Sequence, residues 1–191
     1  VLPFVTAFAE RRQILREAMI VLAFVTAFGF VVVGLLHQPL AILIVFGLMA
    51  CAWPPLAPLI DGYALKGVVR YGLNYGPMRL WGSAAFIVGA LAAGLLLSMI
   101  DPRNLIWVIV AVAFLSAFVS LFLAPLDAPA KSVASARASG LLRRPLFLAI
   151  IGASALIQAS HAAYYGFSAI TWQNAGLSGF TIAVLWSLGV I

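Results

Sequence analysis

Five apolar runs of about 20 residues or more, separated by short polar segments, constrain this chain more than any other feature of its sequence. An α-helix rises about 1.5 Å per residue, so such a run matches the roughly 30 Å hydrocarbon core of a bilayer. Hydrophobic residues make up 65% of the chain and charged residues 8%, a balance that a soluble domain does not need. Strand-like alternation is absent, so we expect an all-α membrane protein. The runs are Ala18–Leu36, Leu40–Ile60, Leu80–Ile100, Leu105–Ala124 and Leu146–Thr171, with shorter apolar segments at Val1–Phe8 and Phe180–Ile191.

The segments that separate these runs are alternately rich and poor in lysine and arginine. All but one of the 11 basic residues fall in three segments, Arg11–Arg16, Asp61–Arg79 and Pro125–Pro145, and the exception is Arg103. The positive-inside rule then places the basic segments in the cytoplasm, with the chain a multi-pass membrane protein. The net charge of +6 follows this topology, so it does not indicate a nucleic-acid partner.

Both ends of the chain lie inside apolar segments, and the chain has no initiating methionine. Neither end resembles a signal peptide. We interpret the chain as an internal piece of a longer protein, or as one recorded only in part, and expect further transmembrane helices of the same protein as its partners. The segment Pro125–Pro145 is rich in Ala, Ser, Pro and basic residues, which predicts a flexible linker between two helical bundles.

Three prolines interrupt the second apolar run near its cytoplasmic end. Proline removes a backbone donor and clashes with the preceding turn, so the helix should bend or break there. A broken helix can form a gate in a transporter. Bends also occur in other membrane bundles, so the sequence leaves the gating interpretation open. The residues concerned are Trp53-Pro54-Pro55 and Pro58.

The third apolar run carries small residues at helical spacing. Small residues let membrane helices approach closely, which predicts a packing surface. A substrate path lined by backbone is the alternative. The residues are Gly82, Ala85, Gly89 and Ala93.

Asp61 follows the proline-rich segment, at the cytoplasmic mouth of the second run. Its carboxylate could form a salt bridge that acts as a latch, either with Arg79 or with the pair Arg11 and Arg12. A solvated loop carboxylate without a partner is the alternative.

A polar and aromatic stripe runs along Leu146–Thr171 around a single histidine. Its members are spaced 4, 3, 4, 3 and 4 residues apart, so they share one face of an α-helix. An ionisable group is costly in hydrocarbon, so this face should meet a water-filled path or a partner. It could be a binding surface in a central cavity, or a hydrogen-bond network that joins helices. The stripe consists of Ser154, Gln158, His161, Tyr165, Ser168 and Trp172, and Tyr164 flanks it.

His161 fits two roles. An imidazole can change its charge near physiological pH, which suits a carrier coupled to protons. A neutral imidazole that makes two hydrogen bonds is equally compatible with the sequence.

Enzyme signatures are absent from the sequence. It contains no GxSxG, HExxH, P-loop or CxxC motif. The single cysteine, Cys51, cannot form an internal disulfide, and no metal-ligand spacing surrounds it. We therefore expect no enzyme activity, no cofactor and no bound metal.

Four stretches of the chain resemble the phenylpropionate permease family of the major facilitator superfamily. They are HAAYYGFSAITWQNAGLS (His161–Ser178), LWSLGVI (Leu185–Ile191), PPLAPLIDGYA (Pro54–Ala64) and YGPMRLWGSAAFIVG (Tyr75–Gly89). The superfamily has twelve transmembrane helices in two six-helix halves. The resemblance implies that this chain runs from the end of helix 2 to the start of helix 8.

In that arrangement residues 1–124 form the C-terminal part of the first half, residues 125–145 the central cytoplasmic loop, and residues 146–191 the start of the second half. The stripe helix is helix 7 and the proline-interrupted helix is helix 4, both of which face the central cavity in this superfamily. The resemblance therefore places Trp53 in the cavity as well. Glu10-Arg11 stands where the superfamily has an acidic–basic gating pair, but the glycine that follows in the superfamily is missing here.

The resemblance implies a secondary transporter that takes up a small aromatic carboxylate, similar to 3-phenylpropionate, with protons by alternating access. The aromatic ring would stack on Tyr164, Tyr165 or Trp172. Gln158 and protonated His161 would hold the carboxylate, with Ser168 nearby. Asp61, Arg79, Glu10 and Arg11 are the predicted gating residues.

Two alternatives remain open at this point. The same fold could carry a nucleoside or a sugar. Such cargoes are also bound through contacts with Trp, Gln and Asn side chains. The chain could instead belong to a non-transporting membrane subunit of a larger complex, with the stripe buried against a partner.

Overall fold

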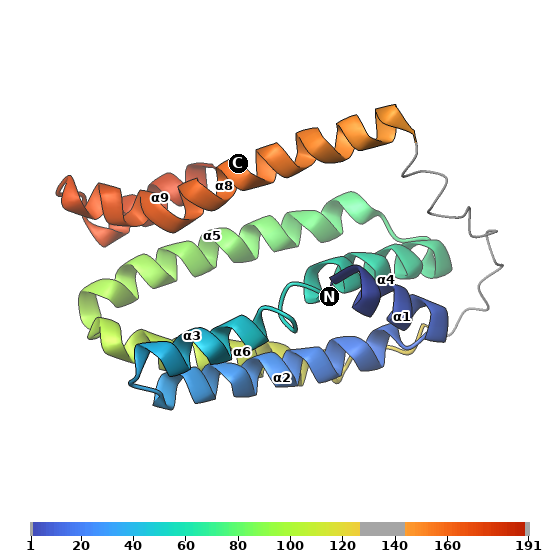
Figure 1. Cartoon of the computed structure of the whole chain (residues 1–191), viewed down its shortest axis with the longest axis horizontal. Coiled ribbons are helices and arrows are strands. Elements are labelled where there is room, and N and C mark those ends of the chain that lie inside the picture. The colour runs from blue at the N-terminus through green and yellow to red at the C-terminus, as the bar shows by residue number, and fades with distance from the viewer. Residues whose placement is uncertain (1, 127–143, 190–191) are drawn as a thin grey trace. The chain divides into compact units, whose positions relative to one another are not determined.

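The computed structural model describes residues 2–126 and 144–189, and in these ranges it contains helices and no strands (Figure 1). This confirms the all-α prediction. Most of the expected central loop, residues 127–143, lies outside the described residues. The elements are α1 (Leu2–Arg12), α2 (Leu15–Leu35), α3 (Pro39–Met49), α4 (Leu56–Tyr71), α5 (Tyr75–Met99), η1 (Pro102–Asn104), α6 (Leu105–Ser120), α8 (Pro145–Asn174) and α9 (Gly179–Leu188).

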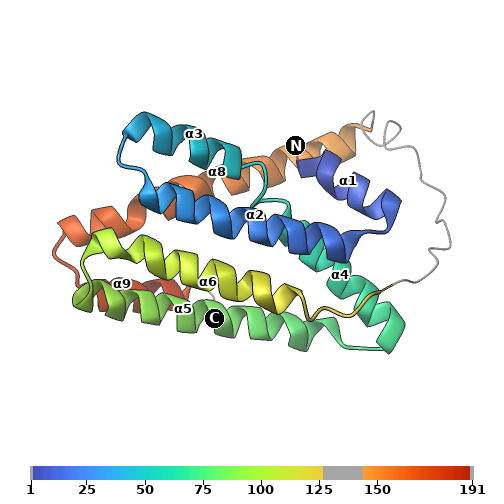
Figure 2. The ribbon, with the colours of Figure 1, turned by 90° about the horizontal axis from the view of Figure 1, so that it is seen from below.

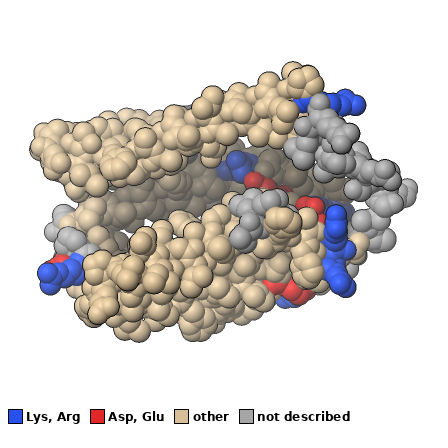
Figure 3. Space-filling model, in the orientation of Figure 1, with Lys and Arg blue, Asp and Glu red and all other residues tan. Residues whose placement is uncertain are grey.

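Within the described residues, three helices are long and apolar enough to cross a bilayer: α2, α8 and residues Tyr75–Leu97 of α5. Helices α3, α6 and α9 are apolar but shorter. The flanks of the helices are covered by uncharged side chains, and the charged ones gather toward the helix ends (Figure 3). None of the residues in the most apolar window of α8 is buried within the chain. A helix this apolar and this exposed requires lipid or other helices around it.

The break predicted in the second apolar run is confirmed. Helix α3 ends at Met49 and α4 begins at Leu56, and Trp53 and Pro54 lie in the turn between them. Prolines have no N–H to donate, so the helical hydrogen-bond ladder cannot continue through this turn. Pro55 is among the most deeply buried residues of the chain and caps the start of α4.

The prediction that Asp61–Arg79 forms a loop is wrong, because most of this segment is helical. Helix α4 continues to Tyr71, and α5 begins at Tyr75. The chain reverses at Gly72, whose φ of 63° is a left-handed conformation that glycine adopts without a steric penalty. Polar residues in this segment suggested a loop, but they lie on helix ends that extend beyond the apolar run.

Residues 1–82 and 99–128 form one compact unit, in which α2 and α6 pack side by side and antiparallel (Figure 2). Two edge-to-face ring contacts join them, with centroid distances of 5.6 Å for Phe24–Phe118 and 5.2 Å for Phe28–Phe114. Helix α3 lies against α2 where Gly29 leaves room for Met49: a Cβ at Gly29 would be 2.6 Å from Met49 Cγ.

The C-terminal end of α6 is held by side chains from α2 and α4. Arg16 donates to the carbonyl oxygens of Leu123 (2.7 Å) and Leu121 (3.1 Å), and the Tyr63 hydroxyl donates to the Ala124 carbonyl (2.6 Å). Leu121 is the C-cap residue of α6, and Leu123 and Ala124 follow it, so these bonds supply donors to backbone carbonyls beyond the helical hydrogen-bond ladder. Burial raises the pKa of Tyr63, which lies outside the candidate membrane spans, and Tyr71 adds to the shift, so the hydroxyl keeps its proton.

Residues 83–98 and 129–191 form the second compact unit, whose described parts are the second half of α5 together with α8 and α9. Helix α9 starts at an N-cap, where the Ser178 hydroxyl accepts a hydrogen bond from the Thr181 N–H. It then contacts the backbone of α5 directly at Gly94. A Cβ at Gly94 would lie 2.6 Å from the Ala183 Cβ and 2.9 Å from the Gly179 carbonyl oxygen.

The close helix approach predicted for the third apolar run is therefore present, but at a different residue. Gly82 and Gly89 have nothing within 4 Å of where a Cβ would stand, whereas Gly94 has no space for one. The assignment of residues 1–124, 125–145 and 146–191 to separate parts of a larger fold stays a prediction.

The Gly94 contact generates a stability prediction. Gly94→Ala should lower the thermal unfolding midpoint, because overpacking a close contact costs about 1–3 kcal/mol. Gly89→Ala, on the same helix, is the matched control and should leave the midpoint nearly unchanged, since its added methyl meets open space. Fluorescence-detected size-exclusion chromatography after heating in detergent measures both. Equal midpoints for the two variants would contradict the contact between α5 and α9.

Candidate functional site

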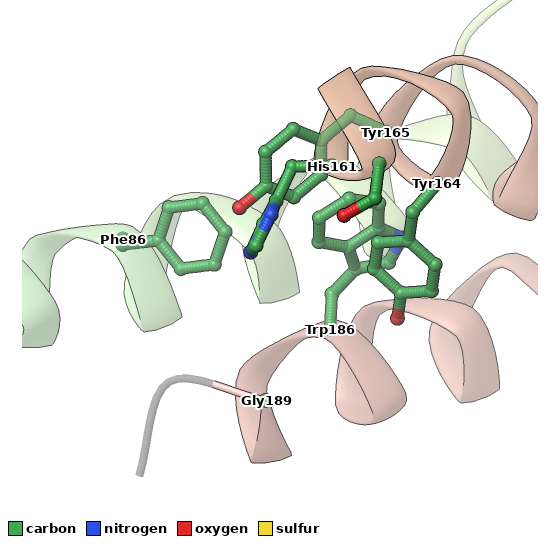
Figure 4. A pocket seen from close by; sticks show the side chains of 7 residues that line it. Phe86, His161, Tyr164, Tyr165, Trp186 and Gly189 are labelled. Atoms are coloured by element: carbon green, nitrogen blue, oxygen red, sulfur yellow. The ribbon is translucent and has the colours of Figure 1, made fainter. Parts of the chain in front are cut away.

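A cavity of about 330 Å³ opens in the second unit and is lined mostly by aromatic side chains (Figure 4). Helix α8 supplies most of its wall, α9 a second part, and Phe86 of α5 a third. Its lining consists of Phe86, Ser160, His161, Tyr164, Tyr165, Trp186 and Gly189.

Helical geometry places both tyrosines next to His161. Tyr164 and Tyr165 stand three and four residues after His161, so each side chain neighbours the imidazole on α8. The ring centroids of His161 and Tyr165 are 5.6 Å apart, and those of Tyr164 and Tyr165 are 5.9 Å apart. The imidazole is directed between Phe86 and the tyrosine and tryptophan rings (Figure 4).

The hydrogen bond of His161 assigns its tautomer. Nδ1 lies 2.8 Å from the carbonyl oxygen of Ile157, one turn earlier in α8. A carbonyl oxygen only accepts, so Nδ1 is the donor in this contact, and Nε2 of the neutral ring is left as a hydrogen-bond acceptor.

The hydroxyl of Ser160 donates to the same Ile157 carbonyl at 2.7 Å. Two polar groups of the cavity wall are thus already occupied by one backbone oxygen. What remains available to a ligand is Nε2 of His161, the tyrosine hydroxyls, the indole N–H of Trp186 and the faces of the rings.

The structure brings three of the predicted binding residues into the cavity: His161, Tyr164 and Tyr165. Trp172 stands next to the wall, where its ring meets Tyr164 edge to face with centroids 5.9 Å apart. It supports a lining residue and is not part of the lining itself.

The other predicted binding residues lie elsewhere. Gln158 is exposed and does not line the cavity. Ser168 is buried, and its hydroxyl makes no hydrogen bond with any described residue. Trp53 belongs to the first unit, where it packs against Phe30 at a centroid distance of 6.1 Å. Their binding roles remain predictions without support from this geometry.

Sequence reasoning missed Trp186 and Phe86. Both lie in apolar helices in which an aromatic residue is ordinary, and no spacing within the sequence connects them to His161. Trp186 is the more consequential of the two, because its ring centroid is 5.1 Å from those of both Tyr164 and Tyr165.

A separate polar cluster lies in the first unit, between α4 and α5. Asp61 Oδ1 accepts a hydrogen bond from Arg79 Nη1 (3.1 Å) and one from the Tyr75 hydroxyl (3.3 Å). Of the partners considered for Asp61, Arg79 is therefore the one observed. Within residues 2–126 no ion pair joins Asp61 to Arg11 or Arg12, and Glu10 and Arg11 are exposed in the last turn of α1.

Among the described residues, His, Cys, Asp and Glu form no group of three or more that could hold a metal ion. Cys51 is a free, exposed thiol in the turn between α3 and α4.

These helices and this cavity define a multi-pass membrane protein. Residues 2–191 match the family model described as MFS_1 like family, so the chain belongs to that family, as its resemblance to the major facilitator superfamily predicted. The fold is accordingly part of a major-facilitator-type bundle, and the family is one of transport proteins, not enzymes.

A curated relative is named "Probable 3-phenylpropionic acid transporter" and comes from Escherichia coli (strain K12). It is 38% identical to this chain over 144 residues, which cover 72% of the chain. The matched region is 37% of that protein, so the chain spans little more than a third of its length. No solved structure matches the chain.

The cavity predicts a pattern of water access along α8. In a Cys51→Ser background, Ser160→Cys should react with a membrane-impermeant maleimide, because a thiol reacts as the thiolate, which needs water. Ile150→Cys is the control on the same helix: its side chain is exposed within the chain and apolar, so we expect it to face lipid and stay unlabelled. Labelling is measured by a gel-shift assay. An unreactive Ser160→Cys would instead support a stripe buried against a partner subunit.

Proposed function

We propose that this chain forms part of a secondary transporter of the bacterial inner membrane that takes up a small aromatic carboxylate together with a proton. Transport proceeds by alternating access of two helical halves. The observation that carries the proposal is the cavity itself, in which one basic nitrogen stands among the faces of several aromatic rings. The printed name of the E. coli relative supports the same class of cargo.

The hydrogen-bonding capacity of the cavity favours an aromatic acid over a sugar. A sugar carries several hydroxyls, each of which needs a partner once it leaves water. Ser160 and Nδ1 of His161 are already bonded to Ile157, which leaves Nε2 of His161, the tyrosine hydroxyls and the indole N–H of Trp186 among the ring faces. These ring faces and the single basic nitrogen match a ligand with one ring and one charged end.

The proton step follows from the assigned tautomer. Neutral His161 takes up a proton at Nε2 and becomes a cation while Nδ1 keeps its bond to Ile157. A carboxylate in a site of low dielectric needs a paired charge, so the protonated ring binds it favourably. Proton and anion then cross together without net charge, and release of the carboxylate on the other side lets Nε2 lose its proton.

The arrangement of basic residues in the first unit supports the proposed sidedness. Arg16 reaches the end of α6, so the segment Arg11–Arg16 and the start of the basic linker lie at the same end of the α2–α6 pair. Arg103 precedes α6 at the opposite end, where Ile106 and Trp107 lie beside Gly34 of α2. We therefore assign the first end to the cytoplasm.

We also propose that the Asp61–Arg79 pair acts as a gate, with Glu10 and Arg11 at the same cytoplasmic side. Both side chains of the pair are about half exposed, so the ion pair contributes little to stability and can open at low cost. Further transmembrane helices of the same protein would complete the cavity, because α8 buries so little of itself within this chain.

Replacement of His161 tests the proton role. In proteoliposomes of the longer protein, His161→Gln should lower pH-driven accumulation of 3-phenylpropionate at least about tenfold, since the loss of one charge pairing costs more than 1.4 kcal/mol. Exchange of labelled for unlabelled substrate should fall less. His37→Gln is the control, because His37 lies in the turn before α3.

Accumulation unchanged in His161→Gln would refute the proton role. Competition of labelled uptake by nucleosides or sugars, and not by phenylpropionate, would refute the aromatic acid as cargo.

Neutralising the two charges of the Asp61–Arg79 pair, and then exchanging them, tests the gate. Asp61→Asn and Arg79→Gln should each lower the uptake rate several-fold while shifting the unfolding midpoint little, because an exposed ion pair is worth about 0–1 kcal/mol. Asp61→Arg combined with Arg79→Asp should recover part of the rate. Asp101→Asn, whose carboxylate bonds only the nearby Arg103 N–H among described groups, is the control. Single variants that transport at the normal rate would argue against a gating role.

A further inference from the structure

The aromatic wall of the cavity depends on a residue from a different helix, Trp186 of α9. Its ring stacks on Tyr165 at 27° and lies at 43° to Tyr164, with both centroids 5.1 Å away. Trp186 is half-buried, whereas Tyr164 and Tyr165 are more exposed, at 45% and 58%. The indole is therefore the most sheltered of these three rings and contacts both others.

Helix geometry alone would not bring the two tyrosines together. Consecutive residues of an α-helix point about 100° apart, so the side chains of Tyr164 and Tyr165 leave α8 in different directions. Their rings nevertheless approach to 5.9 Å, because both turn onto the indole of Trp186 (Figure 4). The Gly94 contact with Gly179 and Ala183 holds α9 against α5 in the same unit.

We propose that Trp186 is a specificity-determining residue of this cavity, which holds Tyr164 and Tyr165 as one continuous wall for a planar ring. The inference rests on the proposed transport of an aromatic carboxylate and goes beyond it by naming what selects the ring. Aromatic pairs contribute attraction beyond their buried area, which a saturated ring of similar size does not receive. The His161 end of the cavity recognises the carboxylate, and Trp186 distinguishes planar from puckered rings.

A pair of ligands separates these two contributions. 3-Phenylpropionate and 3-cyclohexylpropionate have the same carboxylate and the same chain length, and differ in the planarity and π-electrons of the ring. The KM values for uptake of both are measured with the longer protein in proteoliposomes. In the unchanged protein the phenyl compound should have the lower KM. Trp186→Leu should reduce this preference by a factor of about 3–10, and Trp186→Phe should keep it within about twofold.

Trp107→Leu is the matched control, because Trp107 belongs to α6 in the first unit and should leave the preference unchanged. If Trp186→Leu does not reach the membrane, Tyr165→Leu removes the stacked partner of the same wall and should lower the preference equally. A Trp186→Leu protein in which both KM values rise by the same factor would overturn the inference and leave transport intact. An unchanged protein that carries neither acid would overturn the proposed function itself.

Discussion

A backbone that crosses hydrocarbon has to satisfy its own hydrogen bonds, because no water is present to do so. That constraint explains why the described chain is helical and why the helices are apolar on nearly all sides. It also explains where irregular structure occurs. The turn between α3 and α4 is rich in proline and is packed against α2 through Trp53 and Phe30. The backbone carbonyls just beyond α6 accept hydrogen bonds from Arg16 and Tyr63.

The two units use different contacts to hold their helices. In the first, α2 and α6 interlock through phenylalanine rings that meet edge to face. In the second, α5 and α9 meet backbone to backbone at Gly94, and α8 and α9 meet through rings. In a lipid environment apolar burial gives no preference for one helix partner over another, so shape has to provide it. Glycine contacts and ring stacks both depend on how closely the surfaces of two helices fit.

Two small sets of polar groups make local contacts in the described residues. The Ile157 carbonyl accepts bonds from Ser160 and His161, which leaves Nε2 of His161 facing the cavity without a bond to Ile157. Asp61 is shared between Tyr75 and Arg79 at an exposed position, where an ion pair is weak enough to break. The transport that we propose uses both groups: His161 as one that is kept in a fixed orientation, and Asp61 as one that can change partner.

The sequence by itself determined the membrane-spanning class, the break at the prolines and the polar face of α8, because each of these depends on hydrophobicity or period along one segment. It also placed Tyr164 and Tyr165 each beside His161, since i+3 and i+4 are both neighbours of i on a helix. Tertiary structure alone decided that Trp186 completes the cavity and that Gln158 and Ser168 stay outside its lining. It also decided that α5 and α9 approach each other at Gly94, and that Asp61 bonds Arg79 and not Arg11. Those outcomes depend on which helices become neighbours and on how each helix is rotated about its axis. The sequence of a helix that is apolar on all sides contains little information about its neighbours or its rotation.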